Sequence, residues 1–169
     1  MADIFRGAER LMAMDDAAWR RHANPWSGWT RFLTTLPPLL LAIWSRVWLG
    51  WWALVPVALA LFWIWANPRV FPEPARFDAW MSRAVLGERV FIEHRGEIDP
   101  DHRRAALILT CASVPGAVVM VAGLAVLWWE GVVFGGLLTA LPKAWFCDRM
   151  VWIHDDWVRA GRAVPGMEG

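Results

Sequence analysis

The apolar residues of this chain are gathered into two long blocks separated by polar segments. Residues 32–68 contain a single charged side chain, that of Arg46, and residues 105–129 contain none. About 20 apolar residues are enough for a helix to cross the hydrocarbon core of a bilayer. The pattern therefore predicts an integral membrane protein. It disfavours a soluble protein with a large core, because buried helices in such proteins need shorter apolar runs.

The first block is too long for one transmembrane helix. A single helix over residues 32–68 would be about 55 Å long, whereas the hydrocarbon core is about 30 Å thick. Two antiparallel helices over residues 32–49 and 51–66 fit better, with a turn among the tryptophans around Gly50. Several prolines are expected to bend both arms, so the pattern leaves open whether each arm spans the whole bilayer.

The second block predicts another hairpin. Residues 105–129 form the third predicted span and residues 132–152 the fourth, which continues as an amphipathic extension to about residue 162. Gly116 and Gly123 fall on nearly the same face of the third span, where small residues permit close approach of a second helix.

The polar segment between the blocks predicts an amphipathic helix over residues 77–92. At 100° per residue its large apolar side chains fall on one face, whereas Arg89 falls to one side. The apolar face carries Phe77, Trp80, Met81, Ala84, Val85, Phe91 and Ile92. Glu88 lies inside this face, so the helix is expected to lie along the cytoplasmic side of the membrane bundle with one carboxylate turned inward.

Basic residues are distributed unequally between the two sides of the predicted hairpins. Sixteen of the seventeen Lys and Arg residues lie in the N-terminal segment, the middle segment or the part from Lys143 onward, and Arg46 lies on the other side. The positive-inside rule places the richer side in the cytoplasm. Both termini and residues 77–92 are therefore predicted to be cytoplasmic, within one domain over residues 1–169. The opening residues carry too much charge for a signal peptide, so the first apolar block is expected to stay in the mature protein.

Tryptophan is frequent in this chain, with fifteen residues and no tyrosine. In the predicted topology the tryptophans fall at the ends of the spans or just beyond them. Tryptophan rings favour the two interfaces of a bilayer, because one edge is apolar and the other carries a hydrogen-bond donor. The distribution of the tryptophans therefore supports the same topology as the distribution of the basic residues does.

Several blocks of this sequence recur in the same order in a known family. They are RHANPWSGWTR (21–31), WSRVWLGWW (44–52), NPR (67–69) followed by FP, SRAVLGERV (82–90) and WFCDRMVW (145–152). From about residue 15 to residue 157 the chain resembles small prokaryotic membrane proteins classed only as a domain of unknown function. The resemblance implies one compact domain in the bacterial or archaeal cytoplasmic (inner) membrane. It implies no activity, substrate or catalytic residue.

Charged residues near the cytoplasmic end of the fourth span are the first candidates for a site. Ionisable groups at that depth need partners, so Glu88 is expected to pair with Lys143, Arg149 or Arg31. The favoured interpretation is that such a pair simply docks the middle helix under the bundle. The same groups also suggest a polar cleft that binds a lipid headgroup or another anion. The residues assigned to this cleft are Arg31, Glu88, Arg89, Lys143, Asp148 and Arg149.

The four histidines also fall on the predicted cytoplasmic flank, among most of the acidic residues. Histidine and carboxylate ligands suit zinc or non-haem iron, but no HxxxH or ExxH spacing is present. Ordinary interface histidines are therefore the favoured interpretation, and no cofactor or metal is assigned. The alternative is an active site, for which the candidate catalytic residues are His22, Glu88, His102 and Asp148.

The sequence thus predicts an all-α membrane protein with four transmembrane helices in two hairpins, joined by a cytoplasmic amphipathic helix. It favours a non-enzymatic accessory or lipid-interacting module whose partners are the lipid bilayer and either a lipid headgroup or another membrane protein. The alternative is a small membrane-embedded enzyme, with or without a metal, acting on a lipid-soluble substrate. Nucleic acid is excluded as a partner, because topology already accounts for the basic residues.

Overall fold

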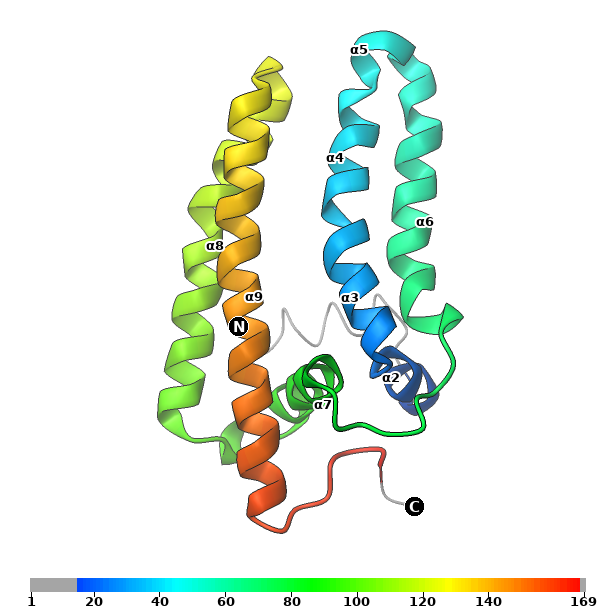
Figure 1. Ribbon diagram of the computed structural model, residues 1–169. Helices are drawn as coiled ribbons and strands as arrows, with labels where there is room; N and C mark the ends of the chain where they lie inside the picture. The colour runs from blue at the N-terminus through cyan, green and yellow to red at the C-terminus, as the bar shows by residue number, and fades with distance from the viewer. Residues whose placement is uncertain (1–14, 168–169) are drawn as a thin grey trace.

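The computed structural model describes residues 15–167, and its regular structure there is entirely helical, which confirms the predicted all-α class. Two helical hairpins stand side by side, and a shorter helix, α7, lies across their lower ends (Figure 1). In chain order the helices are α2 (Asp16–His22), α3 (Pro25–Thr34), α4 (Leu36–Trp44), α5 (Arg46–Leu49), η1 (Gly50–Ala53), α6 (Leu54–Val70), α7 (Trp80–Glu93), η2 (Arg95–Glu97), α8 (Pro100–Val126) and α9 (Trp129–Arg159).

The first hairpin rises through α3, α4 and α5 and returns through α6 (Figure 1). Its first helix begins where the side chain of Asn24 caps the backbone N–H of Trp26 and Pro25 occupies the first turn. The chain reverses at Gly50, whose φ of 54° lies in the left-handed region that glycine adopts without strain. These local signals explain why residues 25–70 form a hairpin.

The second hairpin packs α8 and α9 so closely that their backbones touch. A Cβ atom on Gly116 would lie 2.7 Å from the backbone nitrogen of Thr139, and one on Gly135 would lie 2.4 Å from that of Met120. Gly123 meets the backbone of Val132 in the same way, at 2.8 Å. The close approach predicted from Gly116 and Gly123 is therefore confirmed, and the contacting partner is α9.

The middle helix, α7, differs from its prediction in two respects. It begins at Trp80 rather than Phe77, because Ala79 has an extended backbone and residues 76–78 are not helical. It is also buried on more than one face, and even Arg89, predicted at the side of the helix, is only 5% exposed. The helix α7 is therefore buried more fully than its one-sided apolar pattern predicts, and both hairpins pack against it.

Each hairpin meets α7 through a glycine. A Cβ atom on Gly28 of α3 would lie 2.1 Å from Cγ of Met81, and one on Gly87 of α7 would lie 1.9 Å from the carbonyl oxygen of Met150 in α9. The rings of Trp29 and Trp80 also stack, with centroids 5.7 Å apart. The main core lies around this helix. It consists of Trp19, Ala23, Val85, Leu86, Val90, Phe91, Ile98, Ala106, Phe146, Met150, Ile153, Trp157 and Val164.

At the other end of the molecule, a single charged side chain ties the hairpins together. The Arg46 guanidinium donates a hydrogen bond to the carbonyl oxygen of Leu124, in the last turn of α8. Carbonyls at a helix C-terminus lack partners within the helix and favour positive charge. Arg46 therefore joins α5 to α8 across the gap between the hairpins.

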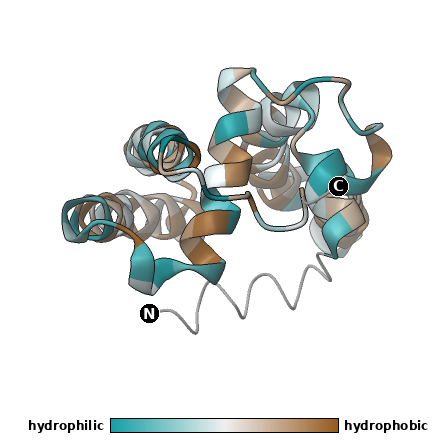
Figure 2. Cartoon of the chain, turned by 90° about the horizontal axis from the view of Figure 1, so that it is seen from below, coloured by the Kyte–Doolittle hydropathy of each residue, from teal (hydrophilic) through white to brown (hydrophobic). Residues whose placement is uncertain are grey.

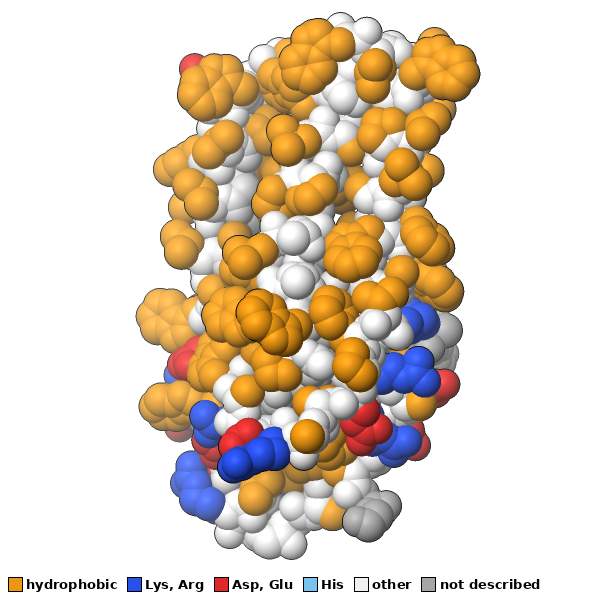
Figure 3. Space-filling view, turned by 45° about the vertical axis from the view of Figure 1, so that its right-hand side comes forward, with side chains coloured by type: hydrophobic (Ala, Val, Ile, Leu, Met, Phe, Trp, Pro, Cys, Tyr) orange, Lys and Arg blue, Asp and Glu red, His pale blue; other side chains and the backbone are white. Residues whose placement is uncertain are grey.

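On the face shown in Figure 3, hydrophobic side chains are spread over the upper part, and most of the visible charged side chains gather toward the lower end. In the view from below, hydrophilic residues lie on the connecting segments and helix ends (Figure 2). Ten of the tryptophans are exposed, with Trp51 at 88% and Trp52 at 76%. Trp19 and Trp157, which the sequence places in the interfacial belt, are instead buried in the core.

By length and composition, two helical stretches are suited to crossing a membrane. They are Pro25–Val70, with a mean hydropathy of 1.9, and Pro100–Val126, with a mean hydropathy of 2.2. Pro25–Val70 contains both arms of the first hairpin. The helix α9 is not one of the two stretches, because Lys143 interrupts its apolar residues. These properties suggest association with a membrane, but they do not by themselves give the four separate spans expected from the sequence.

Candidate functional site

Four ionisable side chains come together where α2, α3, α7 and α9 meet. They are His22, Arg31, Glu88 and Lys143, which together form the charged junction. In its centre the Lys143 ammonium lies 3.2 Å from Oε1 of Glu88. The sequence predicts that Glu88 pairs with Lys143, Arg149 or Arg31, and the structure shows the pair with Lys143. The contact of Gly87 with the α9 backbone brings the two helices close enough for this pair to form.

Glu88 is ionised at the charged junction. Burial by itself raises the pKa of this carboxyl group, but the charge and hydrogen bond of Lys143 hold the pKa below its usual value, with smaller contributions from His22 and Arg31. The side chain of Glu88 remains 25% exposed and that of Lys143 49% exposed. The pair is therefore only partly shielded from its surroundings, and it is weaker than a fully enclosed ion pair.

His22 is neutral and belongs to a buried hydrogen-bonded network. Its Nδ1 lies 2.9 Å from Oγ of Ser27, and the Ser27 hydroxyl donates to Oδ1 of Asn67 at 3.3 Å. Because the hydroxyl proton is directed to Asn67, the tautomer that fits carries its proton on Nδ1 of His22. Burial, followed by the charge of Arg31, lowers the pKa of His22 to about 3.

The network continues to α3, since Nδ2 of Asn67 donates to Oγ1 of Thr30 at 3.0 Å. Ser27 and Asn67 are completely buried, at 0% exposure. Sequence reasoning did not select either residue. The one available signal was that Asn67 is a polar residue at the end of a long apolar run, where a buried amide needs partners.

Arg31 leaves an excess of positive charge at the charged junction. No carboxylate of the described residues lies within ion-pairing distance of its guanidinium, although the charge of Glu88 acts on it from farther away. Arg31 and Lys143 each carry one positive charge, Glu88 carries one negative charge and His22 is neutral, which gives a net charge of +1. The junction therefore favours an anion.

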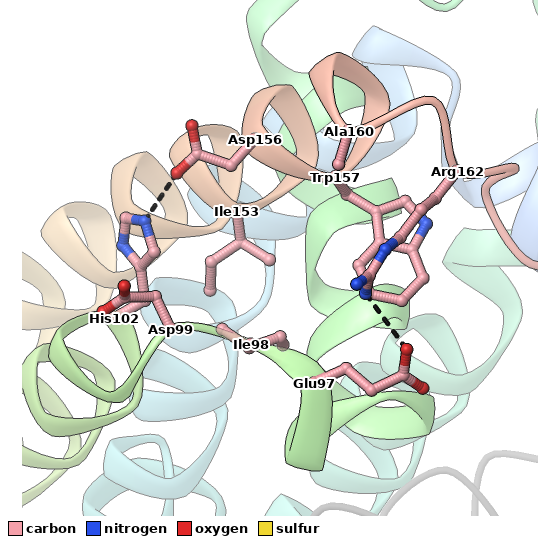
Figure 4. A pocket seen from close by; sticks show the side chains of 9 residues that line it. All are labelled: Glu97, Ile98, Asp99, His102, Ile153, Asp156, Trp157, Ala160 and Arg162. Atoms are coloured by element: carbon pink, nitrogen blue, oxygen red, sulfur yellow. Dashed lines mark hydrogen bonds and ion pairs between the residues drawn. The ribbon is translucent and has the colours of Figure 1, made fainter.

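A second polar cluster lies at the lower ends of α8 and α9 (Figure 4). Nε2 of His102 lies 2.8 Å from Oδ2 of Asp156, and Nδ1 of the same ring faces Arg149 at 3.5 Å. Glu97 pairs with Arg162 at 3.0 Å across the same small pocket, whose volume is about 130 Å³. The charges in this pocket are largely paired with one another, so it offers less to a ligand than the charged junction does.

The remaining residues assigned to the predicted cleft have partners of their own. Arg89 is buried and pairs with Glu93 at 2.8 Å and with Asp16. Asp148 accepts a hydrogen bond from the indole nitrogen of Trp80 at 3.2 Å.

The four candidate catalytic residues also contact four different groups: Ser27 for His22, Lys143 for Glu88, Asp156 for His102 and Trp80 for Asp148. Within residues 15–167, no three His, Cys, Asp or Glu side chains are placed to hold a metal ion.

Comparison with protein families adds the last observation. Residues 6–167 match the model of a family described as "Family of unknown function (DUF6653)". The chain belongs to DUF6653. The family resemblance seen in the sequence blocks is therefore confirmed over nearly the whole chain, although the description of DUF6653 says nothing of a membrane. Searches of curated proteins and of solved structures found no match.

Proposed function

We propose that this DUF6653 protein is a non-enzymatic, membrane-embedded module that binds an anionic group at its charged junction. In this proposal the two hairpins supply four spans, α3 with α4, α6, α8 and α9. The helix α7 and both chain termini lie on the cytoplasmic side. Exposed apolar side chains of α4, α6, α8 and α9 form a nearly uncharged region, called here the hydrophobic band, which supports this placement. The gathering of charged side chains below the hydrophobic band supports it as well.

The excess positive charge of the junction is the observation that carries the proposal. Arg31 extends from the helix that leads into the hydrophobic band, and it has no ion-pair partner within 4.0 Å among the described residues. Positive side chains at such a boundary attract the anionic headgroups of the cytoplasmic leaflet. A lipid phosphate and a free phosphate share this chemistry, and either would neutralise the remaining charge.

The proposal is tested by anion-dependent stabilisation of the full chain in a neutral detergent. Thermal unfolding is followed while inorganic phosphate or a short-chain phosphatidylglycerol is added, with sodium chloride at equal ionic strength as the reference. We expect both anions to raise the Tm, and we expect Arg31→Gln to abolish the increase. Arg76→Gln serves as the matched control, because Arg76 is 81% exposed and pairs with Asp78 away from the junction. Equal effects of chloride and both phosphates would overturn the proposal.

A further inference from the structure

An open apolar groove runs between α4 and α6, within the hydrophobic band. Its volume is about 680 Å³, which falls within the range of roughly 300–1,000 Å³ typical of small-molecule pockets. Small side chains alternate with large apolar ones along it, so the helices leave a channel between them. Leu41, Ala42, Leu59, Ala60 and Trp63 are among the residues that line it.

The polar groups at the lower end of the groove are already occupied. The indole nitrogen of Trp63 donates to Oγ1 of Thr34 at 2.9 Å, and the Thr34 hydroxyl donates to the carbonyl oxygen of Thr30 at 2.5 Å. These bonds leave little for water or a polar ligand to bind, so the groove suits a hydrocarbon occupant.

The groove also begins close to the charged junction. Thr34 follows Arg31 by three residues on α3, which places the two about one helical turn apart. An apolar channel with a positive end is complementary to an anionic lipid, whose acyl chain and phosphate are joined in one molecule.

The length of the groove is comparable with one leaflet of a bilayer. Its lining runs from Thr34 to Leu49 on one side and from Pro56 to Trp63 on the other. At about 1.5 Å per residue these stretches rise about 22 Å and about 10 Å, and half of a hydrocarbon core of about 30 Å is about 15 Å. A neighbouring helix is about 10 Å across, so its backbone is too wide to enter the groove, and only its side chains would reach into it.

We infer that the groove between α4 and α6 holds one acyl chain of an anionic phospholipid whose phosphate lies at the charged junction. The inference rests on the proposed function and sharpens it, because it names a phospholipid rather than a free anion as the ligand. The attraction between the phosphate and Arg31 makes the protein prefer an anionic lipid. The acyl chain adds affinity because its methylene groups are buried in the groove.

Native mass spectrometry of the full chain, titrated with long-chain phosphatidylglycerol or phosphatidylcholine, tests the inference. We expect the wild type to bind phosphatidylglycerol about tenfold more tightly, since a charge-assisted contact is worth that much or more. Ala60→Phe, which fills the groove, should weaken the binding of both lipids about tenfold. Ala58→Phe is the matched control, because Ala58 lies on the same helix, is exposed and does not line the groove. It should bind both lipids as the wild type does.

The outcomes separate the two proposals. If Ala60→Phe binds phosphatidylglycerol as the wild type does, the groove does not hold the acyl chain, and the anion site stands. If Arg31→Gln keeps the full preference for phosphatidylglycerol while Ala60→Phe loses binding, the groove stands and the junction is not the headgroup site. Equal losses of lipid binding in Ala58→Phe and Ala60→Phe would overturn the inference. A wild-type dimer that becomes a monomer in Ala60→Phe alone would also overturn it, because a second copy of the chain would then be the occupant of the groove.

Discussion

The ammonium group of Lys143 lies 3.2 Å from the carboxylate of Glu88 and joins α9 to α7. Around this pair, Gly87 contacts the backbone at Met150 and Phe91 packs edge-on against Phe146. The second hairpin is thus fixed to α7 by a charge pair, a glycine contact and an aromatic contact within about two helical turns of α7.

Replacement of Glu88 should destabilise the protein moderately. We expect Glu88→Gln to lower the free energy of unfolding by about 1–2 kcal/mol, less than for a fully enclosed pair because both side chains are partly exposed. Thermal unfolding in detergent measures the loss. Glu73→Gln is the control, since Glu73 is half-exposed and pairs with Arg20 at the surface. If charge reversal by Glu88→Lys left expression and stability unchanged, the pair would not hold α7 in place.

The stability of the protein should depend on pH through His22. Its folded-state pKa of about 3 lies below the usual 6.5, so between these values the unfolded chain binds a proton that the folded chain does not. This contribution to stability is complete above pH 6.5 and falls by up to about 1.4 kcal/mol per unit as the pH decreases toward 3.

A non-titrating substitution isolates this contribution. His22→Asn retains a donor near Ser27, so we expect its free energy of unfolding to fall less steeply than that of the wild type as the pH decreases from 6.5. Denaturant unfolding at a series of pH values measures the two slopes. Gly96→Ala provides the matched variant, because it changes no titratable group and its new Cβ meets nothing within 4 Å, so it should retain the wild-type slope. Equal slopes in the wild type and His22→Asn would contradict the assignment of a buried neutral imidazole.

Gly87 is required by the close crossing of α7 and α9. In Gly87→Ala the new Cβ would lie 1.9 Å from a backbone oxygen of Met150, so the helices must separate. We expect a loss of about 1–3 kcal/mol or more in the free energy of unfolding, as for other overpacked contacts. Gly96→Ala is the control, because a Cβ at Gly96 meets nothing within 4 Å. Similar Tm values for both variants would mean that the helices cross less closely.

The proposed topology predicts which residues a membrane-impermeant thiol reagent reaches in intact cells. With Cys111 and Cys147 first replaced by serine, a cysteine at Trp51 should be labelled from outside, because this exposed residue lies in the turn opposite α7. A cysteine at Gly96 should be labelled only after the membrane is permeabilised. Labelling of both positions in intact cells would show that the protein does not have the proposed orientation.

Several structural features could be predicted from residue types and spacing because they depend on short-range chemistry. The helical class follows from long apolar runs, and the turn at Gly50 follows from a glycine among residues that end the first apolar arm. Gly116 indicated a close helix contact because only a missing side chain permits it. The Glu88 pairing could be expected because a carboxylate on an apolar face needs a positive partner.

Other features depend on contacts between distant parts of the chain, which periodicity does not contain. The pattern of α7 is that of a one-sided helix, yet Arg89 is buried between Asp16 of α2 and the C-terminal segment at Gly166. Packing by α3 and α9 makes α7 a bridge between the hairpins. His102 joins Asp156 rather than the charged junction because α8 and α9 bring them together.

By itself, the sequence determined the helices, the separation of apolar and charged segments and the need of Glu88 for a partner, since these follow from local preferences and solvation. The tertiary structure decided that Lys143 is that partner, that His22 is neutral within a network reaching Asn67, and that a groove lies between α4 and α6. The physical reason is that burial and long-range charge act between helices whose relative positions are set only when the hairpins pack.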